Sequence, residues 1–157
     1  MKNYIRLFLL SALLLTAQFS FADKSNIQVR NDFQFQIQQY HTQRQGGQEL
    51  NVYVRYALKK DLDSSQYPDY RLLRKQVLDY LEPSDELPTN TYWEIIAERI
   101  GDDLFAQFPI EGVSVQLLVF PNESGEIYEP GFHGPIFTKG KIDPLNVNPP
   151  IISNPSQ

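Results

Sequence analysis

Residues 50–58 read Leu-Asn-Val-Tyr-Val-Arg-Tyr-Ala-Leu, with an apolar side chain at every second position. This period of two predicts a β-strand that buries one face. Residues 27–41 alternate in the same way, with phenylalanine and isoleucine separated by glutamines, so a second strand is expected there. The loop between the two stretches contains Gly46-Gly47, and this turn signal favours an antiparallel hairpin.

The chain changes to helical spacing beyond the hairpin. Apolar residues three and four positions apart run from Leu73 to Leu81, and Pro83 ends this predicted helix. Thr91-Tyr92-Trp93-Glu94 has the Ser/Thr-x-x-Glu pattern of a capping box, which predicts the start of a second helix. The apolar stripe of that helix consists of Trp93, Ala97, Ile100, Leu104 and Phe108.

Two further strands are predicted in the last third of the chain. Residues 113–119 alternate again, and a short strand is expected at 135–138. The order strand-strand-helix-helix-strand-strand is typical of an α+β fold, in which a four-stranded antiparallel sheet carries both helices on one face. Such an open sheet has unpaired edges, which must be protected or paired with another subunit.

The two ends of the chain differ from its middle. Lys2 and Arg6 precede the apolar run 7–15, and Ser20-Phe21-Ala22 forms a small-residue exit. This pattern predicts a signal peptide over 1–22 and export to the periplasm or the medium. Residues 23–141 are expected to form the folded domain. Residues 142–157 contain four prolines and no periodicity, which predicts a disordered tail.

Composition narrows the function. Removing the two basic residues of the predicted signal peptide leaves 14 − 2 = 12 Lys and Arg against 19 Asp and Glu, a net charge of −7. This balance argues against a nucleic-acid partner and against a membrane surface after cleavage. The chain has no cysteine and two histidines, so it offers no disulfide, no thiolate zinc site and little basis for an imidazole one. No metal or cofactor is expected.

Four short motifs resemble one known family. Trp93-Glu94-Ile95-Ile96-Ala97-Glu98-Arg99-Ile100 looks like a Leu-Glu-x-Leu-Ala-x-x-Ile helix start. Tyr67-Pro68-Asp69-Tyr70 resembles a tyrosine-bearing turn, Gly47-Gln48 a strand entry, and Pro130-Gly131 a step before the last strand. Together they resemble the dihydroneopterin aldolase/epimerase family over residues 27–140. The resemblance implies the tunnelling fold and tetrameric or octameric rings with sites between subunits.

The resemblance also implies three site residues. Glu94 matches a glutamate that binds the amino-pyrimidine edge of a pterin, for which a carboxylate suits because it accepts two parallel N–H bonds. Tyr70 matches a tyrosine that assists proton transfer. Gln43 falls where the family has a glutamate in the hairpin loop. The residues alone leave plainer readings open, because Glu94 could close a capping box and Tyr70 could be a half-buried aromatic.

The catalytic set departs from the family pattern. The lysine expected at the end of the third strand falls on Phe120, which cannot carry a proton. Gln43 cannot act as a base either. Lys139 and Lys141 could substitute only if the last strand folded back over the pocket.

Three functions therefore stay open from the sequence. The preferred one is an exported protein of this fold that binds a pterin- or purine-like heterocycle with little or no catalysis. The second is an active dihydroneopterin aldolase or epimerase, a lyase of folate metabolism, with an altered acid/base set. The third is a structural oligomer with a vestigial pocket.

Overall fold

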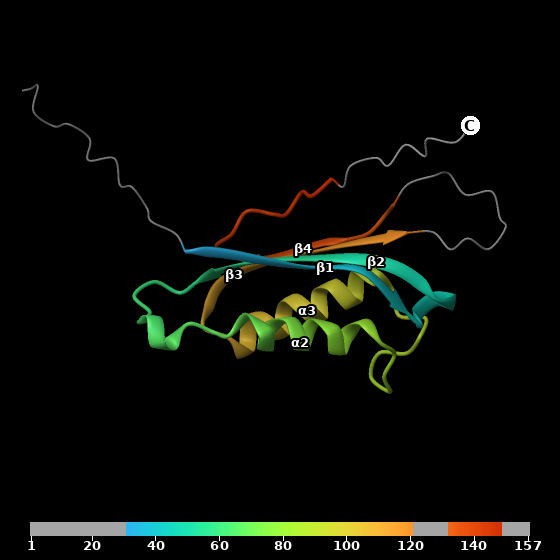
Figure 1. Ribbon diagram of the computed structural model, residues 1–157, viewed down its shortest axis with the longest axis horizontal. Coiled ribbons are helices and arrows are strands. Elements are labelled where there is room, and N and C mark those ends of the chain that lie inside the picture. Colours follow the sequence, from blue (N-terminus) through green and yellow to red (C-terminus); the bar gives the residue numbers. More distant parts are fainter. Residues whose placement is uncertain (1–30, 121–131, 149–157) are drawn as a thin grey trace, which may run out of the picture.

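Figure 1 shows a computed structural model of the chain, which describes residues 31–120 and 132–148. The main elements are β1 (Asp32–Thr42), β2 (Gln48–Leu58), α2 (Tyr70–Leu81), α3 (Trp93–Gln107), β3 (Ile110–Phe120) and β4 (Ile136–Gly140). Two short 3-10 turns, η2 (Arg44–Gly46) and η3 (Ser64–Gln66), lie in the loops. The predicted signal peptide, the first residues of the strand predicted at 27–41, and Pro130-Gly131 lie outside the described residues.

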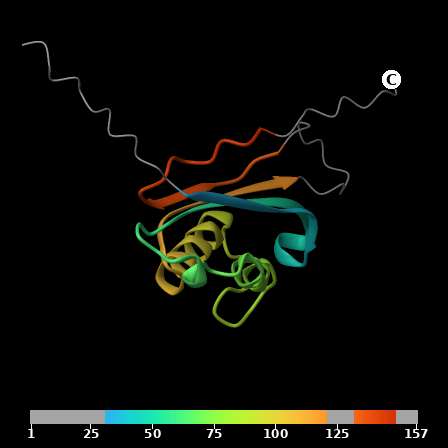
Figure 2. The same ribbon diagram turned by 60° about the vertical axis from the view of Figure 1, so that its left-hand side comes forward.

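The four strands form one antiparallel sheet in the order β1-β2-β3-β4. Both helices cover the same face of this sheet, as Figures 1 and 2 show from two sides. The predicted α+β fold is therefore confirmed. The central strands β2 and β3 pair from Glu49 with Phe120 to Leu58 with Ile110, so the two longest buried stretches lie side by side.

The core lies between the sheet and the helices. Alternate residues of β2 and β3 point into it, as the period of two predicts. The apolar stripe of α3 packs against them, with Trp93, Ile96, Ala97, Ile100 and Leu104 buried. At Gly101 the helix passes so close to β4 that an added Cβ would lie 2.3 Å from the Phe137 ring.

The two helices begin with different kinds of cap. Asp69 caps α2, because its side chain accepts a hydrogen bond from the Arg71 amide at 3.0 Å. The predicted capping box at Thr91 and Glu94 is wrong, since the N-cap of α3 is Tyr92. The Thr91 hydroxyl instead donates to the Pro88 carbonyl at 2.7 Å, so it is turned toward the preceding loop.

The prediction of a disordered tail is wrong for residues 142–148, which we call the strap. The strap turns back after β4 and runs across the face of the sheet that carries no helix (Figure 2). The Leu145 amide donates to Ser114 Oγ at 2.9 Å, and the side-chain amide of Gln116 bonds to both the N–H and the C=O of Val147. Leu145 is buried against Tyr53 and Leu118. Residues 149–157 lie outside the described residues.

Candidate functional site

Several side chains bond to backbone groups where the β1–β2 turn meets the connection between α2 and α3. Five residues of the hairpin, which we call the hairpin clamp, bond to residues 80–93. They are Tyr40, Thr42, Arg44, Gln45 and Gln48. The hairpin clamp matters for the site because this connection leads directly into the first turn of α3, where Glu94 lies.

Arg44 is the centre of the hairpin clamp and is fully buried. Its guanidinium donates to four backbone carbonyls at 2.6–3.3 Å, those of Tyr80, Glu82, Leu87 and Pro88. Burial lowers the pKa of Arg44 from its ordinary value, and the nearby charge of Glu82 opposes that shift. An arginine stays protonated in proteins, so its planar fork binds the end of α2 and the following loop with a permanent charge.

The rest of the hairpin clamp reaches the start of α3. The Gln45 amide donates to the Thr89 carbonyl at 3.2 Å, and its side chain donates to the Thr91 carbonyl at 3.1 Å. Gln48 Oε1 accepts from the Trp93 indole N–H at 3.0 Å. Gln45 and Gly47 have positive φ angles, at 48° and 89°. These angles fold the turn tightly enough to bring both glutamines against the helix start.

Glu94 lies on the surface in the first turn of α3. No described residue donates a hydrogen bond to its carboxylate or forms an ion pair with it. The side chain is thus available to a ligand, and the first-turn position places a negative charge at the positive end of the helix dipole. A free, oriented carboxylate can accept two N–H bonds from a planar heterocycle.

Tyr70 and Gln43 do not join Glu94 in one site within the chain. Tyr70 is the first residue of α2, and α2 and α3 run in opposite directions (Figure 1). The length of α2 therefore separates Tyr70 from the start of α3, about 17 Å at 1.5 Å per residue. Gln43 lies at the Glu94 end of the molecule, but its backbone N–H donates to Glu82 Oε2 at 3.4 Å, at the end of α2.

The end of β3 carries no proton-transfer group. Phe120 is the last residue of the strand, and its ring lies 6.3 Å from that of Phe132.

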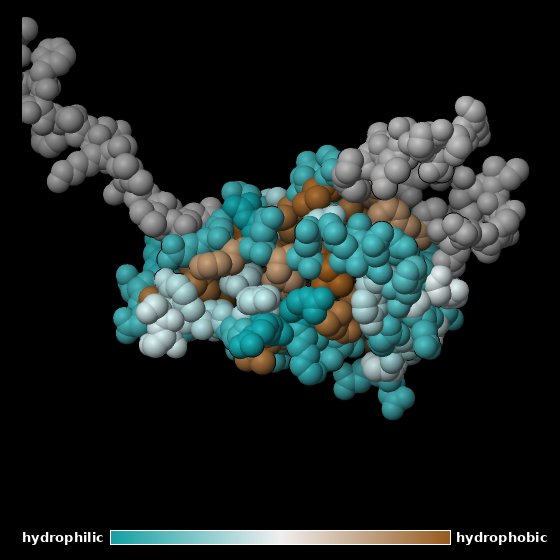
Figure 3. Space-filling view, viewed as in Figure 1, coloured by the Kyte–Doolittle hydropathy of each residue, from teal (hydrophilic) through white to brown (hydrophobic). Residues whose placement is uncertain are grey.

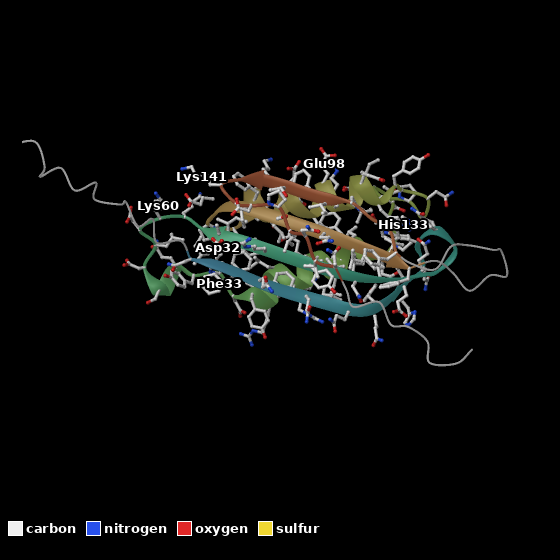
Figure 4. All side chains as sticks on the ribbon, turned by 90° about the horizontal axis from the view of Figure 1, so that it is seen from above. Asp32, Phe33, Lys60, Glu98, His133 and Lys141 are labelled. Atoms are coloured by element: carbon white, nitrogen blue, oxygen red, sulfur yellow. The ribbon has the colours of Figure 1, made fainter. Side chains whose placement is uncertain are left out.

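The two lysines of the last strand lie far from Phe120. Lys139 pairs with Val113 in the sheet, and Val113 precedes Phe120 by seven residues of β3, a distance of about 23 Å. Lys139 forms an ion pair of 2.8 Å with Asp102, and Lys141 lies beyond it near Glu111. His133 forms a β-bridge with Val119, next to Phe120, and Figure 4 shows Lys141 at the opposite end of the sheet from His133. Neither lysine can therefore replace the missing one within a single chain.

Two tyrosines near the hairpin clamp have strongly shifted acidities. Burial, reinforced by a hydrogen bond to Glu82 and its charge, raises the pKa of Tyr40 to about 12. Burial and a short hydrogen bond to Asp103 raise the pKa of Tyr80 to about 12 as well. These phenols stay neutral as donors, which suits structural bonds rather than proton transfer.

Other features of the described residues do not form a second site of this kind. A cavity of about 370 Å³ lies between α2, α3 and their connection, lined by Tyr80, Asp103 and Arg44 among others.

No group of three metal-binding side chains occurs in residues 31–120 and 132–148. No helix in the same ranges is long and apolar enough to span a bilayer.

No sequence pattern marks Arg44, Gln45 or Gln48 as functional residues. They lie in a polar turn in which neither period nor motif distinguishes one side chain from the next. A buried arginine near Gly46-Gly47 could have been suspected only from a closely packed turn, which the sequence does not reveal.

Comparison with solved structures identifies the fold. A dihydroneopterin aldolase from Burkholderia thailendensis bound to guanine aligns with a TM-score of 0.53 at 13% identity, covering 72% of this chain and 93% of that one. The E. coli dihydroneopterin aldolase in complex with neopterin aligns with a TM-score of 0.50 at 17% identity, covering 69% and 99%. No family model and no curated protein matches the sequence. The chain therefore shares the fold of these aldolases.

Proposed function

We propose that this protein is an exported relative of the dihydroneopterin aldolases that binds a pterin- or purine-like heterocycle through Glu94. The observation that supports this most is the exposed, unbonded carboxylate in the first turn of α3, on a helix start held by the hairpin clamp. The two aldolases of similar fold are described with guanine and with neopterin, which share an amino-pyrimidine edge. A carboxylate is the natural partner for that edge.

The binding site is proposed to form between subunits. Large exposed apolar residues of the described chain fall into two groups, which we call the edge patches. One edge patch belongs to β1, α2 and the loop that leads from β2 to α2, and consists of Phe33, Tyr67, Tyr70 and Leu72. The other belongs to α3, β4 and adjoining residues, and consists of Tyr92, Ile95, Phe132 and Ile136. Figure 3, seen from the β1 and α2 side, shows hydrophobic residues exposed among hydrophilic ones between the sheet and the helices.

A head-to-tail contact would bring the edge patches together. It would join the free edge of β1 to the free edge of β4 in the next subunit. The irregularity between Ile37 and Tyr40 limits the regular part of β1 to residues 32–37, which is long enough to pair with all five residues of β4. This contact would also carry Tyr70 of one subunit toward Glu94 of the next, which the single chain holds apart.

Little or no catalysis is proposed at this site. Retro-aldol cleavage needs a group that cycles protons, and such help is worth about 100- to 10,000-fold in rate. Phe120 and Gln43 stand where the resemblance places the ionisable pair, and Lys139 is held by Asp102 at the other end of the sheet. We therefore expect no turnover of dihydroneopterin by the mature protein, whose N-terminus is proposed to be Asp23.

Calorimetry with guanine and neopterin tests the binding. We expect Glu94→Gln to weaken guanine binding by about 1.5–3 kcal/mol, the worth of a charged hydrogen bond, or about 10- to 150-fold. Glu98→Gln is the matched control, because Glu98 is exposed one turn further along the same helix (Figure 4). Equal affinities of both variants, or no binding by the unaltered protein, would leave the structural-oligomer function instead.

A further inference from the structure

The contacts of the hairpin clamp from Arg44 to Gln48 follow the order of the residues that connect α2 to α3. Thr42 bonds to Leu81 at the end of α2, and Arg44 to carbonyls between residues 80 and 88. Gln45 then bonds to Thr89 and Thr91, and Gln48 to Trp93. From Arg44 to Gln48, the residues of the turn thus reach progressively later residues of the connection, up to the first residue of α3.

The connection has little else to hold it. Between residues 82 and 92, Leu87 is the one buried side chain. Its internal bonds join Ser84 with Leu87 and Thr91 with Pro88, and they form two separate small turns. A segment with few buried apolar contacts opens easily unless other elements fix it. The last bonds before the helix are those that Gln45 and Gln48 supply.

We propose that Gln45 and Gln48 are positioning residues for Glu94, and this inference rests on the proposed function. Neither side chain needs to touch the ligand. Gln45 fixes the carbonyl of Thr91, two residues before the helix, and Gln48 fixes the indole of Trp93, the residue next to Glu94. Together they set the direction in which the first turn of α3 presents its carboxylate. A site displaced by a fraction of an ångström loses much of a bidentate hydrogen bond.

The test compares a double variant with a matched control. Gln45→Asn/Gln48→Ala removes both contacts, and asparagine tolerates the positive φ at position 45. Gln66→Ala removes one exposed bond, from the Asp63 amide at 3.0 Å, near the start of α2. Two measurements are made on each full-length protein: guanine affinity by calorimetry, and amide hydrogen exchange at residues 92–95.

We expect the double variant to bind guanine about tenfold more weakly and to exchange faster at residues 92–95, with the control unchanged in both. Unchanged exchange in the double variant, or equally fast exchange in the control, would overturn the inference. If the unaltered protein binds neither guanine nor neopterin, the proposed function fails. The exchange comparison then decides by itself whether the two glutamines position the helix start.

Discussion

Arg44 shows how one side chain can organise a loop. Its guanidinium lies where the β1–β2 turn, the end of α2 and the following connection meet, and it donates hydrogen bonds to four backbone carbonyl oxygens there. Removing a charge from water is costly unless its donors are all satisfied, and four bonds of 2.6–3.3 Å satisfy most of them. Lysine could not replace this fork, because its ammonium is a point charge with three donors.

We expect Arg44→Met to lower the free energy of unfolding by about 3 kcal/mol or more, because several buried carbonyls lose their donor at once. Urea denaturation measures this loss. Arg74→Met is the control, since Arg74 is exposed on α2 and makes no described ion pair. Equal midpoints for the two variants would show that water replaces the guanidinium without cost.

The two shifted tyrosines predict a dependence of stability on pH. Both phenols have a folded pKa of about 12 against about 10 unfolded, so the folded state favours the neutral form. Their stabilising contribution is complete below pH 10 and is lost as the pH rises from 10 to 12. Urea midpoints measured across this range should fall less steeply in Tyr40→Phe/Tyr80→Phe. A parallel fall in both proteins would contradict the shifts.

At the scale of elements, α3 packs closely against β4 because residue 101 is a glycine, which has no side chain. Gly101 is buried within the helix, where alanine would be the better helix former by about 1 kcal/mol. The neighbouring ring of Phe137 leaves no room for that methyl group. Helix propensity and packing therefore oppose each other at this position, and packing decides.

We expect Gly101→Ala to destabilise the protein by about 1–3 kcal/mol, as overpacking does. Phe137→Ala removes the clashing ring, so the double variant should lose less than the sum of the two single losses. Thermal or urea unfolding of all four proteins completes the cycle. Strictly additive losses would mean that β4 moves aside without strain.

The strap is a second contact between elements, and Gln116 supplies two of its hydrogen bonds. Gln116 makes two bonds to Val147, each worth about 1 kcal/mol. We expect Gln116→Ala to loosen the strap and to speed tryptic cleavage after Lys141 several-fold. Gln107→Ala, at an exposed glutamine at the end of α3 on the opposite side of the sheet, is the control. Unchanged cleavage would show that Leu145 alone anchors the segment.

At the scale of the whole molecule, the two free sheet edges and the edge patches predict association. We expect light scattering of the mature protein to report a mass of four or more chains. Ile136→Lys places a charge on the β4 edge and should lower that mass, since lysine at an edge opposes pairing. Ala106→Lys, exposed near the end of α3 and outside the edge patches, should not. A monomer for the unaltered protein would contradict the proposed interface.

The sequence by itself determined the elements and their order. Alternation at 50–58 and 113–119 requires strands that bury one face, and the stripe from Trp93 to Leu104 requires a helix on that face. These periods are local, so they can be read without knowing the fold. The same holds for the position of Glu94 near a helix start, although the predicted cap, Thr91, lies one residue before the actual one.

Only the tertiary structure decided what these elements bring together. It placed Tyr70 far from Glu94, paired Lys139 with Asp102, and bonded the strap to Ser114 and Gln116. It also buried Arg44, although arginine as a residue type is mostly found at the surface. The positions of Lys139, the strap and Arg44 depend on contacts between residues 31 to 44 positions apart. Local periodicity carries no information about such contacts, because it records which face of an element is buried and not what covers it.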